Sequence, residues 1–191
     1  MHKSGAEPIR KAALINAAIA VVGQAGSLDV TVAQIARHAG MSPALAHHYF
    51  GSKTQMFLAA MRHILSRYGA AVRAGLSGVA DPEARAAAIL KASFSGDNFD
   101  RDTTAAWLNF YALALTDPQA ARLLAVYHRR LRSNLVHALR PRLGDRAGQV
   151  ADTMGALIDG VYLRAVLERR DGPNPDHAAA LVSDYLHEVL S

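Results

Sequence analysis

Apolar residues recur along almost the whole chain at the three- and four-residue spacing of an amphipathic helix. In the first such segment Leu14, Ala17, Ala18 and Val21 fall on one face. No stretch shows the sustained alternation of apolar and polar residues, bounded by hairpin turns, that is typical of a half-buried strand. The pattern therefore predicts an all-α protein of about nine helices.

Helix starts are marked by side chains that cap a first turn, or by a proline there, where the missing N–H would be unpaired in any case. The signals are the capping-box spacings Thr31-Gln34 and Ser52-Gln55, together with Ser42-Pro43, Asp81-Pro82, Asp117-Pro118 and Pro175. They define short helices up to residue 53 and a long helix over 54–76. The helix that starts at Pro118 is expected to reach about Leu139. We predict an N-terminal domain over 1–53 and a larger helical domain over 54–191, with helix 54–76 as the connector.

The segment Thr31–Phe50 reads TVAQIARHAGMSPALAHHYF, two short helices around a tight glycine turn. This is the geometry of a helix-turn-helix. On the second helix Leu45, Ala46 and Phe50 point one way, and small residues begin the opposite stripe, which lets that face approach base edges in a major groove. The predicted groove contacts are Pro43, Ala44, His47 and His48, and the predicted phosphate contacts are Thr31, Ser42, Tyr49 and Lys53. A helical hairpin in some other all-α protein, with Thr31 and Ser42 acting only as caps, is the alternative.

The distribution of charge along the sequence favours binding of a polyanion by the N-terminal part of the chain. The net charge is +5, but residues 1–80 hold 8 Lys and Arg against 2 Asp and Glu, whereas residues 81–191 hold 13 against 14. The basic excess thus coincides with the helix-turn-helix and is compatible with binding double-stranded DNA.

Composition excludes several other classes. The chain has no cysteine and no apolar run near the roughly 20 residues that span a bilayer, and Met1 to Lys11 lack a signal-peptide core. We expect a cytoplasmic protein without a membrane segment. No nucleophile–base set or glycine-rich phosphate loop occurs. The adjacent His47 and His48 diverge by about 100° on a helix, so they cannot easily bind one metal ion together. An all-α enzyme is therefore the weakest reading, and no metal or cofactor is expected.

The motif residues resemble the DNA-binding domain of the TetR family of repressors. The resemblance rests on Thr31, Ile35-Ala36, Ala39-Gly40-Met41-Ser42, His48-Tyr49-Phe50 and Lys53, followed by an apolar helix. It implies a homodimer that places two recognition helices in successive major grooves, and a C-terminal domain that binds a small-molecule effector. His47 departs from the tyrosine that many members carry, so their phosphate contact does not transfer to it.

Four later segments resemble the BetI-type, choline-responsive repressors of this family. They are residues 96–100, 106–111, 127–136 and 156–165. The resemblance implies choline or a related quaternary ammonium compound as effector. A TetR-family repressor that answers to an apolar or multidrug ligand, and a DNA-binding architectural protein without an effector, remain alternatives.

The residues themselves allow a cation-binding cage. Aromatic faces and a carboxylate suit a quaternary ammonium group, which donates no hydrogen bond. The candidate residues lie at helical spacings on two helices: Trp107, Phe110 and Tyr111 on one, Asp159 and Tyr162 on the other. The alternative is that these aromatics are ordinary core and Asp159 pairs with an arginine.

Two further features concern surfaces of the larger domain. The basic run His128, Arg129, Arg130 and Arg132 either attracts an anionic ligand or forms a solvated face. The last two helices, 147–169 and 175–190, are the predicted dimer surface, because Gly155 and Gly160 allow a partner helix to approach closely.

Overall fold

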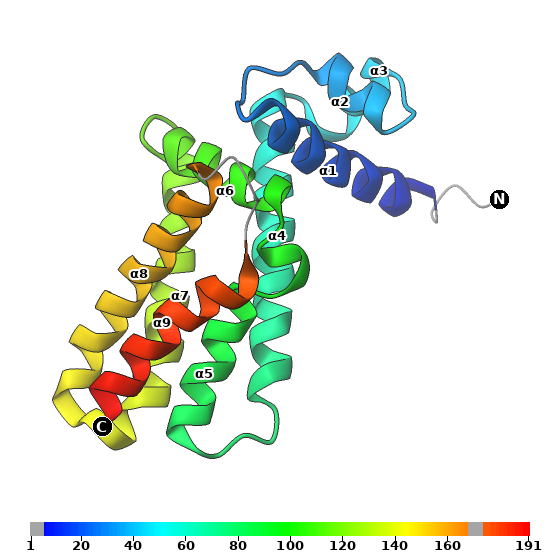
Figure 1. Ribbon diagram of the computed structural model, residues 1–191. Coiled ribbons are helices and arrows are strands. Elements are labelled where there is room, and N and C mark those ends of the chain that lie inside the picture. The colour runs from blue at the N-terminus through cyan, green and yellow to red at the C-terminus, as the bar shows by residue number, and fades with distance from the viewer. Residues whose placement is uncertain (1–5, 168–173) are drawn as a thin grey trace.

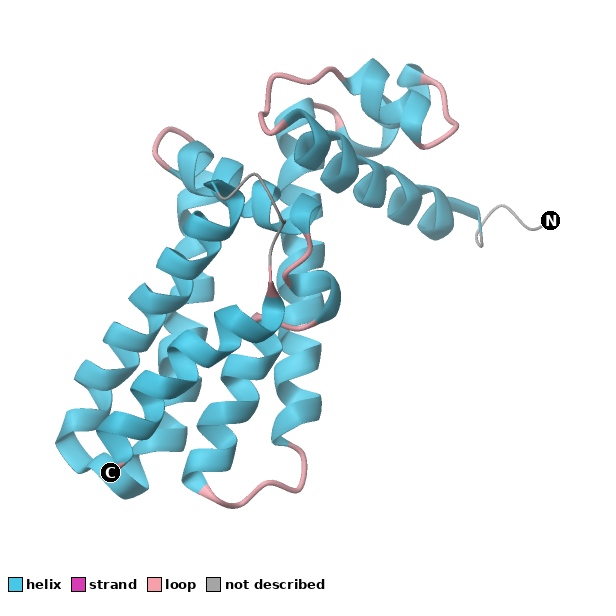
Figure 2. Cartoon of the chain, in the orientation of Figure 1, coloured by secondary structure: helices cyan, strands magenta, loops and turns pink. Residues whose placement is uncertain are grey.

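The computed structural model describes residues 6–167 and 174–191, except for the side chain of Asp97. The described part contains nine α-helices, two 3-10 turns and no strand (Figure 2). This confirms the predicted all-α class. The helices are α1 Ala6–Ala25, α2 Val32–His38, α3 Pro43–Phe50, α4 Lys53–Leu76, α5 Pro82–Ser93, α6 Arg101–Ala114, α7 Pro118–Leu143, α8 Ala147–Leu167 and α9 Pro175–Leu190.

Helices α1–α3 gather at one end of the molecule, and α4 runs from them into a bundle with α5–α9 (Figure 1). Buried residues form a continuous core through both parts, from Leu14 and Ile35 to Ile158 and Val182. The boundary at residue 53 falls where α4 begins. It stays a prediction, because the continuous core joins the two parts.

Helix α2 starts as predicted. The Thr31 hydroxyl accepts a hydrogen bond from the Gln34 N–H at 3.1 Å, and the Gln34 side chain accepts one from the Thr31 N–H at 2.6 Å, which completes a capping box. At α4 only half of the predicted box forms. Ser52 caps the Gln55 N–H, but the Gln55 amide instead donates to Gln119 at the start of α7. The tertiary contact has replaced the local one.

Helix α7 runs past its predicted end at about Leu139. It continues through Pro141 to Leu143, and Gly144, with φ of 52°, ends it. Pro141 has no N–H to donate to the His137 carbonyl, but only two residues of the helix follow it, so a kink there displaces little of α7. The predicted end of the next helix, near residues 169–171, lies outside the described residues.

Helix α1 packs directly on α6 as well as on α4. The two helices approach so closely that a Cβ atom at Gly23 would lie 2.5 Å from the Cα of Asp102. Only a glycine permits this separation. The N-terminal end is therefore joined to the bundle through α6, in addition to the predicted connector helix.

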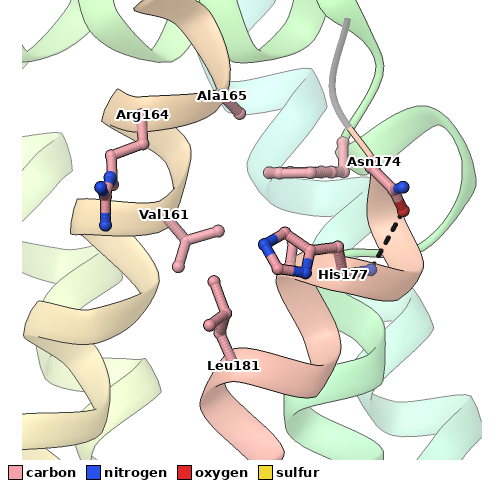
Figure 3. Close-up of a pocket in the computed structure, with 8 residues that line it drawn as sticks. Val161, Arg164, Ala165, Asn174, His177 and Leu181 are labelled. Atoms are coloured by element: carbon pink, nitrogen blue, oxygen red, sulfur yellow. Dashed lines mark hydrogen bonds between the residues drawn. The ribbon is translucent and has the colours of Figure 1, made fainter. Parts of the chain in front are cut away.

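Helices α8 and α9 lie side by side along one face of the bundle (Figure 1). The Asn174 side chain caps α9 by accepting from the His177 N–H at 3.0 Å, beside a small pocket of about 170 Å³ (Figure 3). Four leucines on these two helices expose between 36% and 64% of their surface. They are Leu157, Leu163, Leu167 and Leu181.

Candidate functional site

Helix α3 exposes the face that the sequence assigned to a major groove. Ser42, Pro43, Ala44, His47 and His48 are all exposed, whereas Ala46 is fully buried. The Ser42 hydroxyl accepts from the Leu45 N–H at 3.3 Å, which leaves its proton free to donate. Thr31 is exposed in the same way at the start of α2. These positions meet the steric requirement for a recognition helix.

Two of the predicted contacts have partners inside the protein. His47 Nδ1 lies 3.1 Å from the carbonyl oxygen of Gly51 and donates to it, which leaves Nε2 as the ring nitrogen for any other contact. The Lys53 ammonium donates to the Leu28 carbonyl at 2.8 Å. Lys53 therefore fixes the loop before α2 and keeps two N–H donors for other contacts.

Tyr49 is half-buried beside the first helix. The Lys11 ammonium lies 5.5 Å from the centre of its ring and forms an ion pair with Glu7 at 2.7 Å. Lys11 lowers the pKa of Glu7 by a hydrogen bond and by its charge. This pairing offsets the negative charge of Glu7, which also lies near enough to His48 to interact with it electrostatically.

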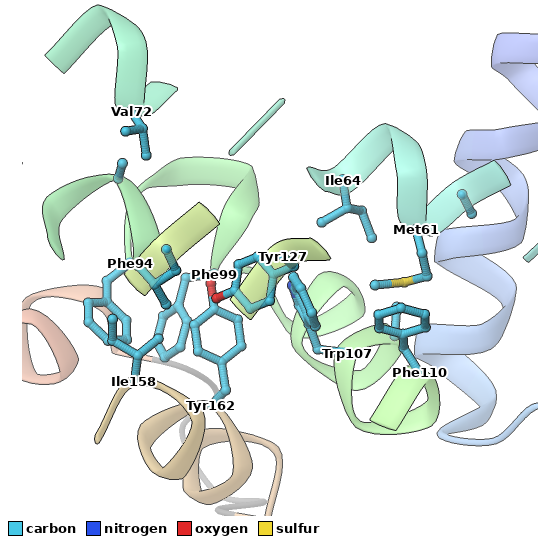
Figure 4. Packing of buried hydrophobic residues seen from close by; sticks show 14 of the residues in the cluster. Met61, Ile64, Val72, Phe94, Phe99, Trp107, Phe110, Tyr127, Ile158 and Tyr162 are labelled. Atoms are coloured by element: carbon cyan, nitrogen blue, oxygen red, sulfur yellow. The ribbon is translucent and has the colours of Figure 1, made fainter. Parts of the chain in front are cut away.

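In the bundle, the predicted ligand residues of α6 and α8 come together with residues of α7. The ring centroid of Trp107 lies 4.8 Å from that of Tyr127 and 6.2 Å from that of Tyr162 (Figure 4). It lies 5.7 Å from the ring centroid of Tyr111. Trp107, Tyr127 and Tyr162 are each less than 10% exposed. We call Trp107, Tyr111, Tyr127 and Tyr162 the aromatic cluster.

Asp159 lies at the edge of the aromatic cluster with both carboxylate oxygens engaged. Oδ1 accepts a hydrogen bond from the Tyr111 hydroxyl at 2.8 Å, and Oδ2 lies 3.4 Å from His128 Nε2. Burial, followed by the charge of Asp159, raises the pKa of Tyr111, so this phenol stays a hydrogen-bond donor. The arrangement holds a carboxylate in a fixed orientation next to aromatic rings.

Phe110 also contacts Trp107, with ring centroids 5.8 Å apart, but from the side opposite Tyr162. It is fully buried and lies beside Met61 (Figure 4). Tyr162 contributes its ring but not its hydroxyl, which donates toward the Ser93 and Asn98 carbonyls. The four predicted aromatic residues are thus neighbours, and among them Tyr111 is the one hydrogen-bonded to Asp159.

The outer side of Asp159 borders a surface groove. A hollow of about 410 Å³ between α7 and α8 has His128 and Asp159 in its wall, along with Gly155 and Ala156. A second carboxylate in this wall, Asp152, is paired with Arg132 at 2.7 Å. Asp159 can therefore be reached from solvent, unlike Trp107.

Sequence reasoning missed Tyr127 and His128 as members of this site. Tyr127 supplies the ring closest to Trp107, and His128 is the second partner of Asp159. The signal was present, because Tyr127 begins one of the segments that carries the BetI-type resemblance. The residue was passed over because the basic run that follows it dominates the local pattern.

Other kinds of site find little support in the described residues. No three His, Asp or Glu side chains gather there in a way that could hold a metal ion. Within the same residues, no helix has the length and hydrophobicity required to cross a membrane.

Comparisons with known proteins agree with this architecture. Residues 82–191 match the family described as BetI-type transcriptional repressor, C-terminal, and residues 14–60 match the tetR family of bacterial regulatory proteins. The HTH-type transcriptional regulator BetI of Brucella anthropi is 50% identical over 187 residues, covering 97% of this chain and 96% of the relative. BetI of Rhizobium meliloti is 43% identical over 192 residues, covering 100% of this chain and 94% of the relative.

Solved structures share the fold. A regulator from Saccharomonospora viridis, described as a complex with choline, superposes with a TM-score of 0.82 at 23% identity, covering 93% of this chain and 95% of that one. A regulator from Rhodococcus sp. Rha1 gives a TM-score of 0.83 at 21% identity, covering 94% and 95%. At such identities the likeness extends to the fold alone.

A helix-turn-helix carried on a helical bundle with a polar-aromatic core defines a DNA-binding transcriptional repressor, a class of regulators and not of enzymes. The chain belongs to the TetR family and, within it, to the BetI type.

Proposed function

We propose that this repressor binds its operator as a homodimer and that choline, or a related quaternary ammonium compound, modulates this binding from a site at Asp159 and the aromatic cluster. The observation that carries the proposal is the Asp159 carboxylate, oriented by the Tyr111 hydroxyl beside the ring of Trp107. The BetI relatives and the choline complex of a distant structural neighbour support the same effector class.

The chemistry of the site favours this class of ligand. A quaternary ammonium group makes no hydrogen bonds, so its binding depends on aromatic faces and on an opposite charge. Tyr111 is the half-buried member of the aromatic cluster, and Asp159 borders the groove between α7 and α8. An effector that enters from this groove meets the carboxylate first and the aromatic rings behind it.

The rings are packed together, so a bound cation requires Trp107 or Tyr111 to move. Such a movement would be felt at α1, because Asp102, five residues before Trp107 on α6, touches Gly23. Coupling between two sites in proteins is typically about 1 to 3 kcal/mol, or about 5- to 150-fold in affinity. An effect of this size on operator binding is sufficient for regulation.

The dimer proposed here uses α8 and α9. The four exposed leucines on these helices form an apolar surface that a second copy would cover, and Gly155 and Gly160 have open space beside them. Two α3 helices about 34 Å apart would then reach successive major grooves. Because a repressor must reach its operator DNA, we place the protein in the cytoplasm.

The proposal is tested by titrating purified protein with choline while recording the fluorescence of Trp107, the single tryptophan. Asp159→Asn should weaken choline binding by on the order of 10-fold, since it removes the charge nearest the cation. Operator affinity of the ligand-free protein should stay unchanged. Asp152→Asn is the matched control, because it removes one carboxylate from the same helix at the ion pair with Arg132.

Betaine and a hydrophobic dye serve as comparison ligands. A response to the dye with none to choline would overturn the proposed effector and favour a regulator of an apolar or multidrug ligand. Operator affinity that no small molecule changes, with little sequence preference, would instead indicate an architectural DNA-binding protein.

A further inference from the structure

A second hollow in the bundle lies between α4 and α7, and Asp159 is not in its wall. It has a volume of about 670 Å³, within the range of small-molecule sites. Its apolar wall consists of Leu65, Val72, Leu76, Leu123 and Val126. We call this hollow the α4/α7 cavity.

The arginines that line the α4/α7 cavity are not paired with acidic residues. Arg62, Arg73 and Arg130 line it, and neither α4 nor α7 contains an Asp or Glu. Among the described residues, none of these three guanidinium groups has a carboxylate within ion-pair distance. Arginine that lines an apolar cavity without an internal partner is suited to a carboxylate or a phosphate.

A second polar group in the α4/α7 cavity also lacks a partner. Tyr127 lines the cavity and is only 7% exposed, yet no hydrogen bond to its hydroxyl occurs within the described residues. Burial raises the pKa of Tyr127 well above its ordinary value, so the hydroxyl remains a donor. Arg130 follows Tyr127 by three residues on α7, which places both groups on one side of the helix.

The shape of the α4/α7 cavity favours an elongated ligand. Gln55 near the start of α4 is hydrogen-bonded to Gln119 near the start of α7, and the cavity then follows both helices. Arg62 and Arg73 are eleven residues apart on α4, or about 16 Å along the helix axis. A hydrocarbon chain can therefore lie along the apolar wall while its head group meets a guanidinium.

We propose that the α4/α7 cavity binds an amphipathic anion, with its carboxylate or phosphate head at Arg130 and the Tyr127 hydroxyl and its hydrocarbon chain along α4. The ligand class is opposite in charge to the effector proposed for Asp159. The two sites share Tyr127, whose ring packs against Trp107 while the residue also lines the α4/α7 cavity. The apolar leucines of α8 and α9 lie on other helices, so a dimer formed through them leaves the α4/α7 cavity open. A ligand held here presses on α4, which packs against α1 and α3.

The test uses the full-length protein and three probes with the same ten-carbon chain, each below its critical micelle concentration. Decanoate and decyl phosphate should bind saturably in calorimetry. Decyltrimethylammonium, which the site at Asp159 can also bind, is compared in the Asp159→Asn variant and should bind there at least about tenfold more weakly than decanoate because of the arginines. Arg130→Gln should weaken decanoate binding by about tenfold or more. Arg122→Gln, on an exposed part of α7 outside the cavity, is the matched control and should leave it unchanged.

Val126→Trp, which fills the α4/α7 cavity, gives a second test that does not depend on charge. It should abolish decanoate binding while the far-ultraviolet circular dichroism stays that of the parent. Equal affinity of the Asp159→Asn variant for decanoate and decyltrimethylammonium, or equal effects of Arg130→Gln and Arg122→Gln, would overturn the proposal. Decanoate affinity that falls in Asp159→Asn but not in Arg130→Gln would move the binding to the other site and overturn it as well.

Discussion

Removing one hydroxyl from Tyr162 and one from Tyr111 should have opposite consequences for stability and for effector binding. The Tyr162 hydroxyl is buried and donates toward the Ser93 and Asn98 carbonyls, tying α8 to the turn before α6. The Tyr111 hydroxyl donates to Asp159, whose side chain is 34% exposed. Both changes to phenylalanine keep the aromatic ring, so a difference between them reports on the hydroxyl alone.

The expected loss of stability depends on whether the partner of the removed hydroxyl is buried or can bind water instead. Tyr162→Phe leaves buried carbonyl oxygens unpaired, which costs about 1 to 3 kcal/mol. For a chain of this size, 1 kcal/mol lowers the melting temperature by about 2 to 4 °C, so the fall should be about 2 to 12 °C. Tyr111→Phe exposes a carboxylate oxygen that water can reach, and it should cost less than about 1 kcal/mol.

Effector binding should show the reverse order. Without the Tyr111 hydroxyl, Asp159 loses one of the two groups that hold its carboxylate in place, and choline affinity should fall by about fivefold. Tyr162→Phe keeps the ring that faces Trp107 and should bind choline within about twofold of the parent. The assays are thermal unfolding by circular dichroism and choline titration by Trp107 fluorescence. Unchanged melting of Tyr162→Phe, or unchanged choline affinity of Tyr111→Phe, would refute these roles.

Two other changes probe the helices that link the two ends of the molecule. Gly23→Ala places a Cβ 2.5 Å from the Asp102 backbone, and this overpacking should destabilise the protein by about 1 to 3 kcal/mol. The melting temperature should fall accordingly, and operator affinity should change. Gly69→Ala is the control, because its new Cβ meets only the end of the Arg73 side chain, at 3.4 Å, and the substitution should not destabilise the protein. Equal melting temperatures of the two variants would contradict the close α1–α6 contact. Burial, and then Arg67, lower the pKa of His63 in the folded state, so the unfolded state takes up a proton more readily and stability falls as the pH drops below about 6.5. His63→Gln should therefore match the parent at pH 8 and melt above it at pH 5.5, and a constant difference at both pH values would count against this reasoning.

Helix starts were predictable because their signals are local. A serine, threonine or aspartate that caps a first turn acts within three residues, and Ser42, Asp81 and Asp117 all do so in the structure. The capping box at Ser52 failed in part because Gln55 found a partner 64 residues away. No pattern within one helix indicates such a competing contact.

The candidate effector site was only partly predictable, for a geometric reason. Successive residues of a helix turn by about 100°, so Phe110 and Tyr111 lie about 60° to one side and 40° to the other side of Trp107. One side faces Met61 and the core near α4, and the other faces Asp159. Spacing alone predicts a shared face of α6 but not which neighbour each residue meets. That depends on α7, whose Tyr127 and His128 complete the site.

If the proposed effector site is correct, helix α6 links it to the helix-turn-helix. Trp107 and Tyr111 belong to the aromatic cluster, while Asp102, less than one and a half turns earlier, rests against Gly23 of α1 with no space for a methyl group. A close-packed contact transmits displacement instead of absorbing it. A shift of α6 that makes room for an effector must therefore move α1 or open the contact at Gly23, and either result changes the position of the helix-turn-helix relative to the bundle. In a dimer fixed through α8 and α9, this change would alter the distance between the two recognition helices.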